Sequence, residues 1–323
     1  MKKMIPLKND IAHVALSLPE GFVAISTCRG ELVDGDNYSG FNACHYTGDA
    51  PEHVDECRKR LCALLGVSRD FLVIPRQTHS LNVAVIDSLP VDEAALEDVD
   101  ALVSTIHDVA IAINTADCVP LAFCDEDAGI KAVAHSGWKG TVGRIAALSV
   151  QKMVEQGADV VRIKVAMGPC ICGDCFEVGP EVVERFVEGG FDNSQVILHG
   201  YGERDHIDLP QACRQALIEV GVPQQNISLP QYCSRCNHST FFSARRLGIN
   251  SGRTLTLIKG RRRHACVFRT YNTIITQSLG DCNCGVISGS IFLCHKCGVE
   301  VYSIARCHTF FCAVVELRFE VAL

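Results

Sequence analysis

The alternation of apolar and polar residues along the chain predicts three amphipathic helices. Apolar side chains recur every three or four positions over residues 54–64. The same spacing covers residues 209–220, directly after Asp208, a residue type that often caps the start of a helix. A third helix is predicted over residues 141–156, with Gly157 ending it.

Short apolar runs bounded by turn residues predict buried strands. These runs are residues 71–74, 109–114, 121–124, 130–134 and 161–166. Several of them crowd into residues 71–135 before the next helix, so strands and helices alternate only in part. The pattern therefore favours an α/β or α+β domain with a mixed sheet over a regular doubly wound sheet.

Composition and charge exclude several classes of protein. Of the 323 residues 48% are hydrophobic and 21% charged, which is typical of a globular chain and excludes wholesale disorder. The net charge is −7 and the only dense basic run is residues 261–263, so nucleic acid is not an expected partner. No signal-peptide pattern and no run of 18 apolar residues is present, so we expect a cytoplasmic protein that does not bind membranes.

Cysteine and charge are unevenly distributed, and both change near residue 260. Twelve of the 19 cysteines lie in residues 1–260 and seven in residues 261–323, while the net charge changes from −10 to +3. We therefore predict one domain over residues 1–260 and a separate cysteine-rich extension over residues 261–323. We interpret the extension as non-functional rather than as a small zinc module, and expect catalysis not to need it. Without a signal peptide, the thiols are expected to be reduced.

Three polar segments follow predicted strands, at residues 76–80, 115–118 and 135–140. Strand ends are where α/β proteins commonly place functional sites. The segments contain His79, Cys118 and His135, and two imidazoles with one thiolate suit Zn²⁺ while leaving a fourth position open. Spacing alone leaves other interpretations open: a surface histidine, a buried thiol and a hydrogen-bonded histidine.

Six segments in this order closely resemble the YfiH-type family, formerly called the polyphenol oxidase or laccase-domain family. They are RQTHS, DALVS, TADCVPLAFCD, AVAHSGWKGTVGRI, MGPCICGDCFEVGPEV and FFSARRLGINSGRTLTLI. The resemblance covers about Gly21 to Ile258, and no part of it reaches the cysteine-rich extension.

The resemblance implies an α/β sandwich of mixed sheets with outer helices, similar to a bacterial toxin deamidase domain. It also implies a zinc-containing purine nucleoside phosphorylase, acting with phosphate on adenosine, inosine, guanosine and methylthioadenosine, with adenosine deaminase activity. Its metal ligands correspond to His79, Cys118 and His135. The older name fits poorly, because a laccase needs several copper ions and many more histidine ligands.

Phosphorolysis needs positive side chains to hold the phosphate. Arg29 and Lys139 are the candidates: the resembling family commonly has a Thr-Arg-x-Gly segment where this chain has residues 27–30, and Arg or Lys after the tryptophan. Each could instead be a solvated charge. Gln77 is a further candidate for substrate binding, with a hydrogen bond inside the protein as the alternative. The segment over residues 28–36 is less glycine-rich and more acidic than the family's usual loop, so substrate preference stays open.

Deamination by a zinc-bound water, with a pKa lowered to about 7, would need a nearby acid or base to move protons. Asp117 is the nearest carboxylate in the sequence, with a structural hydrogen bond as the alternative. Cys118 and His135 also permit a metal-free cysteine hydrolase, with the thiol as nucleophile and the imidazole as base. A non-catalytic metal protein is a third possibility, for which a fourth protein ligand is expected. The oligomeric state cannot be predicted.

Two further cysteine clusters lie in the predicted domain, at residues 170–175 and 233–238. Their Cys-x-x-Cys pairs resemble a zinc ribbon, but 57 residues separate Cys175 from Cys233, against a usual spacer of about 15–20. The spacing therefore favours cysteines that pack in the core over a structural zinc site.

Overall fold

The computed structural model describes residues 11–191, 194–200 and 204–261. The predicted cysteine-rich extension lies outside these residues from residue 262 onward, so its proposed role stays a prediction. Within the described ranges, no helix is long and apolar enough to cross a membrane.

The first sheet has five strands in the order β1-β2-β13-β6-β3. Their bounds are His13–Ala15 for β1, Phe22–Thr27 for β2, Thr254–Gly260 for β13, Ala110–Thr115 for β6 and Leu72–Val73 for β3. Strands β2 and β6 both run antiparallel to β13, and β3 runs parallel to β6. The carboxyl ends of β2, β3 and β6 therefore lie at one edge of this sheet.

The second sheet has six strands in the order β12-β9-β7-β8-β5-β4. Their bounds are Ile227–Ser228 for β12, Lys164–Met167 for β9, Val119–Asp125 for β7, Ile130–Ser136 for β8, Ala101–Ser104 for β5 and Val83–Ile86 for β4. Strands β7 and β8 are antiparallel, with Pro120 opposite His135. A separate pair is formed by β10 (Ile197–Leu198) and β11 (His206–Ile207).

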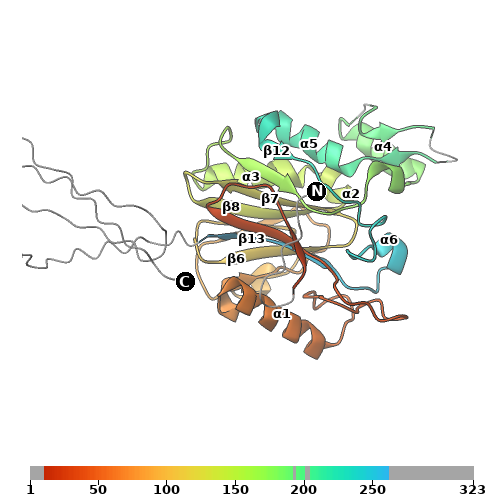
Figure 1. Ribbon diagram of the computed structural model, residues 1–323. Helices are drawn as coiled ribbons and strands as arrows, with labels where there is room; N and C mark the ends of the chain where they lie inside the picture. Colours follow the sequence, from red (N-terminus) through yellow and green to blue (C-terminus); the bar gives the residue numbers. More distant parts are fainter. Residues whose placement is uncertain (1–10, 192–193, 201–203, 262–323) are drawn as a thin grey trace, which may run out of the picture. The chain divides into compact units, whose positions relative to one another are not determined.

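The two sheets lie face to face, with one apolar cluster between them (Figure 1). Ile111 of β6, Ile258 of β13 and Val133 of β8 belong to this cluster, and all three are fully buried. The outer faces of both sheets are buried as well, against helices. Strands covered on both faces are apolar along their whole length, which explains the short uninterrupted runs in the sequence.

Helices form the two outer layers of the sandwich (Figure 1). Helix α1 (Pro51–Leu65) packs on the first sheet and α3 (Ile145–Glu155) on the second, while α5 (Leu209–Glu219) packs on α3 and α4 (Pro180–Glu188) on the short helix α2 (Trp138–Val142). A further short helix is α6 (Ala244–Leu247). Single 3₁₀ turns span Arg69–Phe71, Glu93–Leu96, Gly173–Cys175 and Gln224–Asn226. The predicted mixed-sheet sandwich with outer helices is thus confirmed.

Two predicted helices are confirmed and the third needs correction. Helix α5 begins after Asp208, whose carboxylate accepts a hydrogen bond from the Gln211 N–H, as expected of an N-cap. The single helix predicted over residues 141–156 is instead α2 and α3, separated at Gly143 and Arg144. Arg144 has a φ of +61°, a left-handed conformation that interrupts the helix. The predicted strand over residues 161–166 begins only at Lys164.

Candidate active site

The three ligand candidates meet at the edge where β3, β6 and β8 end. His79 follows β3, Cys118 lies between β6 and β7, and His135 is near the end of β8. One ligand atom from each lies within 4.8 Å of the other two. The Cys118 Sγ is 3.8 Å from His79 Nε2, and the two imidazole rings meet edge to face with centroids 4.7 Å apart. We call these three residues the His-Cys-His cluster.

Asp100, directly before β5, holds two members of the cluster in place. Its fully buried carboxylate is 2.6 Å from His135 Nδ1 and accepts hydrogen bonds from the backbone N–H groups of Thr78, His79 and Ser80. With Nδ1 engaged, His135 has Nε2 left to face the cluster, an arrangement common behind metal-binding histidines. Asp100 begins one of the resembling segments, but a single carboxylate before a strand gives no pattern from which to predict this role.

Backbone strain is concentrated at the cluster. His79 has a φ of +64° and Asp117 a φ of +87°, both in the left-handed region that non-glycine residues seldom adopt. The Asp117 carboxylate accepts hydrogen bonds from the Ser234 hydroxyl and the Arg245 N–H, each at 2.7 Å. Both of its oxygens thus hold the backbone beside Cys118, as expected for the structural role.

Gly137, which follows β8, leaves the room that the cluster needs. A Cβ atom at this position would lie 2.6 Å from His79 Cδ2 and 3.0 Å from Cys118 Sγ. Any side chain would therefore displace the imidazole or the thiol, so glycine is required here for close approach.

The charges of the cluster favour a thiolate. Burial raises the pKa of the Cys118 thiol, but the positive charges and hydrogen bonds of His135 and His79 outweigh burial and hold that pKa below its usual range. Burial conversely lowers the pKa of His135, yet the Cys118 thiolate and the Asp100 carboxylate raise it overall. Cys124 of β7 shows the contrast, because burial raises the pKa of its thiol to about 12.

The donor set of the cluster fits a divalent metal of borderline softness. Two imidazoles and a thiolate match the ligands of Zn²⁺, and the orientation of His135 by Asp100 supports ligation through Nε2. Among the described residues the cluster has three members, so a tetrahedral ion would keep one position for water or substrate.

Arg29, two residues after β2, is buried at 5% exposure. Its guanidinium donates to the His238 carbonyl at 3.1 Å and lies 4.5 Å from the centre of the Phe242 ring. The Nε atom is buried and has no hydrogen-bond partner among the described residues. A buried N–H group without a partner is costly, so an acceptor such as a water oxygen or a ligand atom is expected beside it.

Gln77 and Lys139 occupy different environments. The Gln77 amide donates to the Asn114 carbonyl at 2.8 Å and accepts from the Asn114 N–H and the Tyr46 hydroxyl. These bonds agree with the second interpretation of Gln77, a hydrogen bond inside the protein. Contact between Gln77 and substrate stays a prediction. Lys139 is exposed in α2, with its Nζ 5.7 Å from the centre of the Trp138 ring, and its proposed role is likewise untested.

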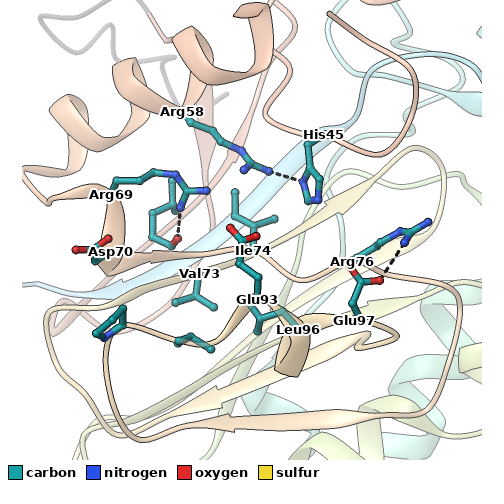
Figure 2. A pocket seen from close by; sticks show the side chains of 13 residues that line it. His45, Arg58, Arg69, Asp70, Val73, Ile74, Arg76, Glu93, Leu96 and Glu97 are labelled. Atoms are coloured by element: carbon teal, nitrogen blue, oxygen red, sulfur yellow. Dashed lines mark hydrogen bonds and ion pairs between the residues drawn. The ribbon is translucent and has the colours of Figure 1, made fainter. Parts of the chain in front are cut away.

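A pocket of about 400 Å³ lies between α1, β3 and the turn over residues 93–96 (Figure 2). Arg58 in its wall hydrogen-bonds His45, and Arg76 pairs with Glu97. No residue of the His-Cys-His cluster lines this pocket, so its volume is not evidence about the site at the sheet edge.

Comparison with known proteins shows similarity to an adenosine deaminase and to a purine nucleoside phosphorylase. It is 55% identical over 245 residues to adenosine deaminase RL5 of an unidentified prokaryote, covering 73% of this chain and 93% of the relative. It is 36% identical over 243 residues to a purine nucleoside phosphorylase of Bacteroides thetaiotaomicron, covering 72% and 88% of the two chains. Among solved structures it is similar to Bacillus licheniformis YfiH, with a TM-score of 0.68, 25% identity and coverage of 74% and 93%.

The family model described as multi-copper polyphenol oxidoreductase laccase matches residues 23–261. This range contains both sheets from β2 onward and all three residues of the cluster. The chain belongs to this family, the YfiH-type family whose members include the purine nucleoside phosphorylase and the YfiH structure to which it is similar.

Proposed function

We propose that the protein is a zinc-dependent purine nucleoside phosphorylase with adenosine deaminase activity. The observation that carries the proposal is the His-Cys-His cluster, held by Asp100, in a chain similar to an adenosine deaminase and to purine nucleoside phosphorylases. Adenosine, inosine, guanosine and methylthioadenosine are the proposed substrates, with phosphate as the second substrate.

Zinc bound by His79, Cys118 and His135 would supply a Lewis acid and lower the pKa of a water molecule in the open position. The residues of the chain would orient the ligands and hold the backbone around the ion. Asp100 keeps a proton on His135 Nδ1 and fixes the loop that carries His79. Asp117 holds the backbone next to Cys118 through Ser234 and Arg245, so the cluster is rigid before substrate binds.

For phosphorolysis we assign the phosphate to Arg29. Its buried guanidinium has an N–H group without a partner in the described part of the chain, and a phosphate oxygen would supply the missing acceptor. The segment that contacts Arg29 through His238 also contacts Asp117 through Ser234 and Arg245. The two parts of the proposed site are therefore supported by one continuous stretch of chain.

A metal-free cysteine hydrolase is the second candidate. Cys118, His135 and Asp100 have the order of nucleophile, base and orienting carboxylate that such enzymes use. His79 argues against it, because a second imidazole 3.8 Å from the Cys118 Sγ has no place in that mechanism and is required in a metal site.

The proposed chemistry predicts different phosphate requirements for two products of adenosine. Adenine should form only when phosphate is present, since phosphate is the nucleophile that releases the base. Inosine should form at the same rate without phosphate, because water is the nucleophile. Chromatography of both products over a range of phosphate concentrations measures this. Adenine released equally fast in phosphate-free buffer would indicate a nucleoside hydrolase instead.

The Arg29→Gln variant tests the phosphate assignment within the same assay. It should raise the phosphate concentration needed for half-maximal adenine release by about tenfold or more, because one charge-assisted hydrogen bond contributes about 1.5–3 kcal/mol. Inosine formation serves as the internal control for folding. Arg76→Gln is the matched control, because Arg76 is exposed and paired with Glu97. Equal phosphate dependence in both variants would remove Arg29 from the site.

A further inference from the structure

Four cysteines from two distant segments come together outside the His-Cys-His cluster. The Sγ atoms of Cys172, Cys175, Cys233 and Cys236 all lie within 4.8 Å of one another. The sulfurs of Cys175 and Cys236 are 3.4 Å apart, well beyond the 2.03–2.05 Å of a disulfide bond. We call these residues the four-cysteine cluster.

Backbone pairing explains how residues so far apart in the sequence meet. Cys170 and Cys233 form an isolated parallel bridge, in which the Cys170 N–H donates to the Tyr232 carbonyl and the Ser234 N–H donates to the Cys170 carbonyl. The bridge aligns the two Cys-x-x-Cys segments side by side. The long spacer that argued against a metal site in the sequence is therefore spanned by tertiary structure.

Core packing, which the sequence favoured for these cysteines, does not describe their environment. Cys172 and Cys233 are only half-buried and Cys236 is exposed, whereas Cys170 beside them is buried at 1% exposure. Packing cysteines resemble Cys170 in burial, and a solvent-facing sulfur gains nothing from the core. The expectation of core packing is thus wrong for at least Cys236.

The backbone around Cys233 is arranged to stabilise a thiolate. The N–H groups of Cys236 and Cys172 point at its Sγ, at 3.5 and 3.4 Å. Hydrogen bonds from two backbone N–H groups favour the charged form of this sulfur. Arg235, between the two cysteines of its segment in the sequence, adds a positive charge to this segment. Such donors compensate the negative charge that four thiolates would bring to one ion.

We infer that the four-cysteine cluster is a structural zinc site separate from the His-Cys-His cluster. Four sulfurs at tetrahedral positions about 2.3 Å from a zinc ion lie about 3.8 Å apart, a separation that small movements of these side chains would reach. All four positions are filled by protein, so no position stays open for substrate, as in structural rather than catalytic zinc sites.

The site would stiffen the neighbouring active-site region. Ser234, between two of the cysteines, donates to Asp117, and the Ile171 N–H donates to the Asp117 carbonyl at 2.9 Å. A zinc ion joining the two segments would therefore fix both contacts to the residue before Cys118. The inference about the four-cysteine cluster does not depend on the proposed reaction.

Metal analysis of the full chain, purified under reducing and anaerobic conditions, tests the inference. The Cys233→Ala/Cys236→Ala variant should contain one zinc ion fewer per chain than the unaltered protein, and Cys118→Ala should lack a different one. Combining all three substitutions should remove two. Because only differences between variants are compared, any zinc held by residues 261–323 cancels. The matched control Cys57→Ala/Cys62→Ala removes two thiols from α1 and should leave the zinc content unchanged.

Alkylation of the unaltered protein gives an answer even where a variant fails to fold. In the native state, iodoacetamide should leave exposed Cys236 and its three partners unmodified, and should label all four after a chelator removes zinc. Rapid labelling of Cys236 before chelation would overturn the inference. So would a Cys175–Cys236 disulfide in non-reducing peptide mapping, iron in place of zinc, or equal zinc content in Cys233→Ala/Cys236→Ala and the control.

Discussion

The Cys118→Ala variant should lose the metal of the His-Cys-His cluster together with activity on purine nucleosides. Its thiolate is the one negatively charged member of the cluster, and alanine leaves two imidazoles around the position of the ion. We expect metal affinity at this site to fall by at least about a hundredfold, since losing a hydrogen-bond partner behind a ligand already costs about 10–100-fold. Metal content after dialysis against a chelator of known affinity measures the change.

Cys124→Ala is the matched control, because Cys124 is a fully buried thiol in β7, the strand that begins directly after Cys118. It should reduce stability modestly and leave the metal in place. A Cys118→Ala protein that retained a full equivalent of tightly bound metal at His79 and His135 would show that the ligand set is wrong. Loss of activity with retained metal would instead favour the cysteine nucleophile.

The Asp100→Asn variant should weaken metal binding by about 10–100-fold without removing any ligand. An asparagine side chain has one oxygen in place of two, whereas the Asp100 oxygens accept from His135 Nδ1, three backbone N–H groups and the Ser80 hydroxyl. The amide nitrogen must then face a donor, so either His135 or the His79 loop loses its support. Competition with a chromophoric chelator measures the affinity.

Asp125→Asn separates this effect from a general loss of stability. Asp125 is also a fully buried carboxylate that accepts backbone N–H groups, but it lies at the end of β7 remote from Cys118 and pairs with Arg162. Both variants should unfold at lower temperature, and only Asp100→Asn should bind metal more weakly. Equal metal affinity in the two variants would reduce Asp100 to a purely structural residue.

The strands and helices that build the layers of the fold could be predicted, because each one has its own pattern of apolar residues within a short stretch of sequence. Strands buried on both faces have uninterrupted apolar runs, and α1 and α5 have clear helical spacing. The break between α2 and α3 could not be predicted, since Arg144 adopts its left-handed conformation through tertiary contacts to Glu219 and Gly189. Tertiary packing there overrides local preference.

The site residues differ in how far the sequence could identify them. His79, Cys118 and His135 were found through resemblance, because 39 and 17 positions separate them and no spacing rule connects them. The role of Asp100 could not be predicted, because its carboxylate accepts hydrogen bonds from the loop that carries His79, about 20 residues earlier in the sequence. The meeting of the four cysteines could not be predicted for the same physical reason, since a parallel bridge at Cys170 brings together segments that sequence spacing separates.

Activity of the metal-free protein tests the central claim most directly. The full chain should be stripped of metal with a chelator, assayed with adenosine in the presence of phosphate, and then titrated with Zn²⁺ while metal content and both products are followed. We predict that adenine and inosine formation are lost with the metal and return in proportion to zinc bound at the His-Cys-His cluster, with Cys118→Ala failing to recover. Full activity in protein shown to contain no metal would contradict the account and favour the metal-free cysteine hydrolase.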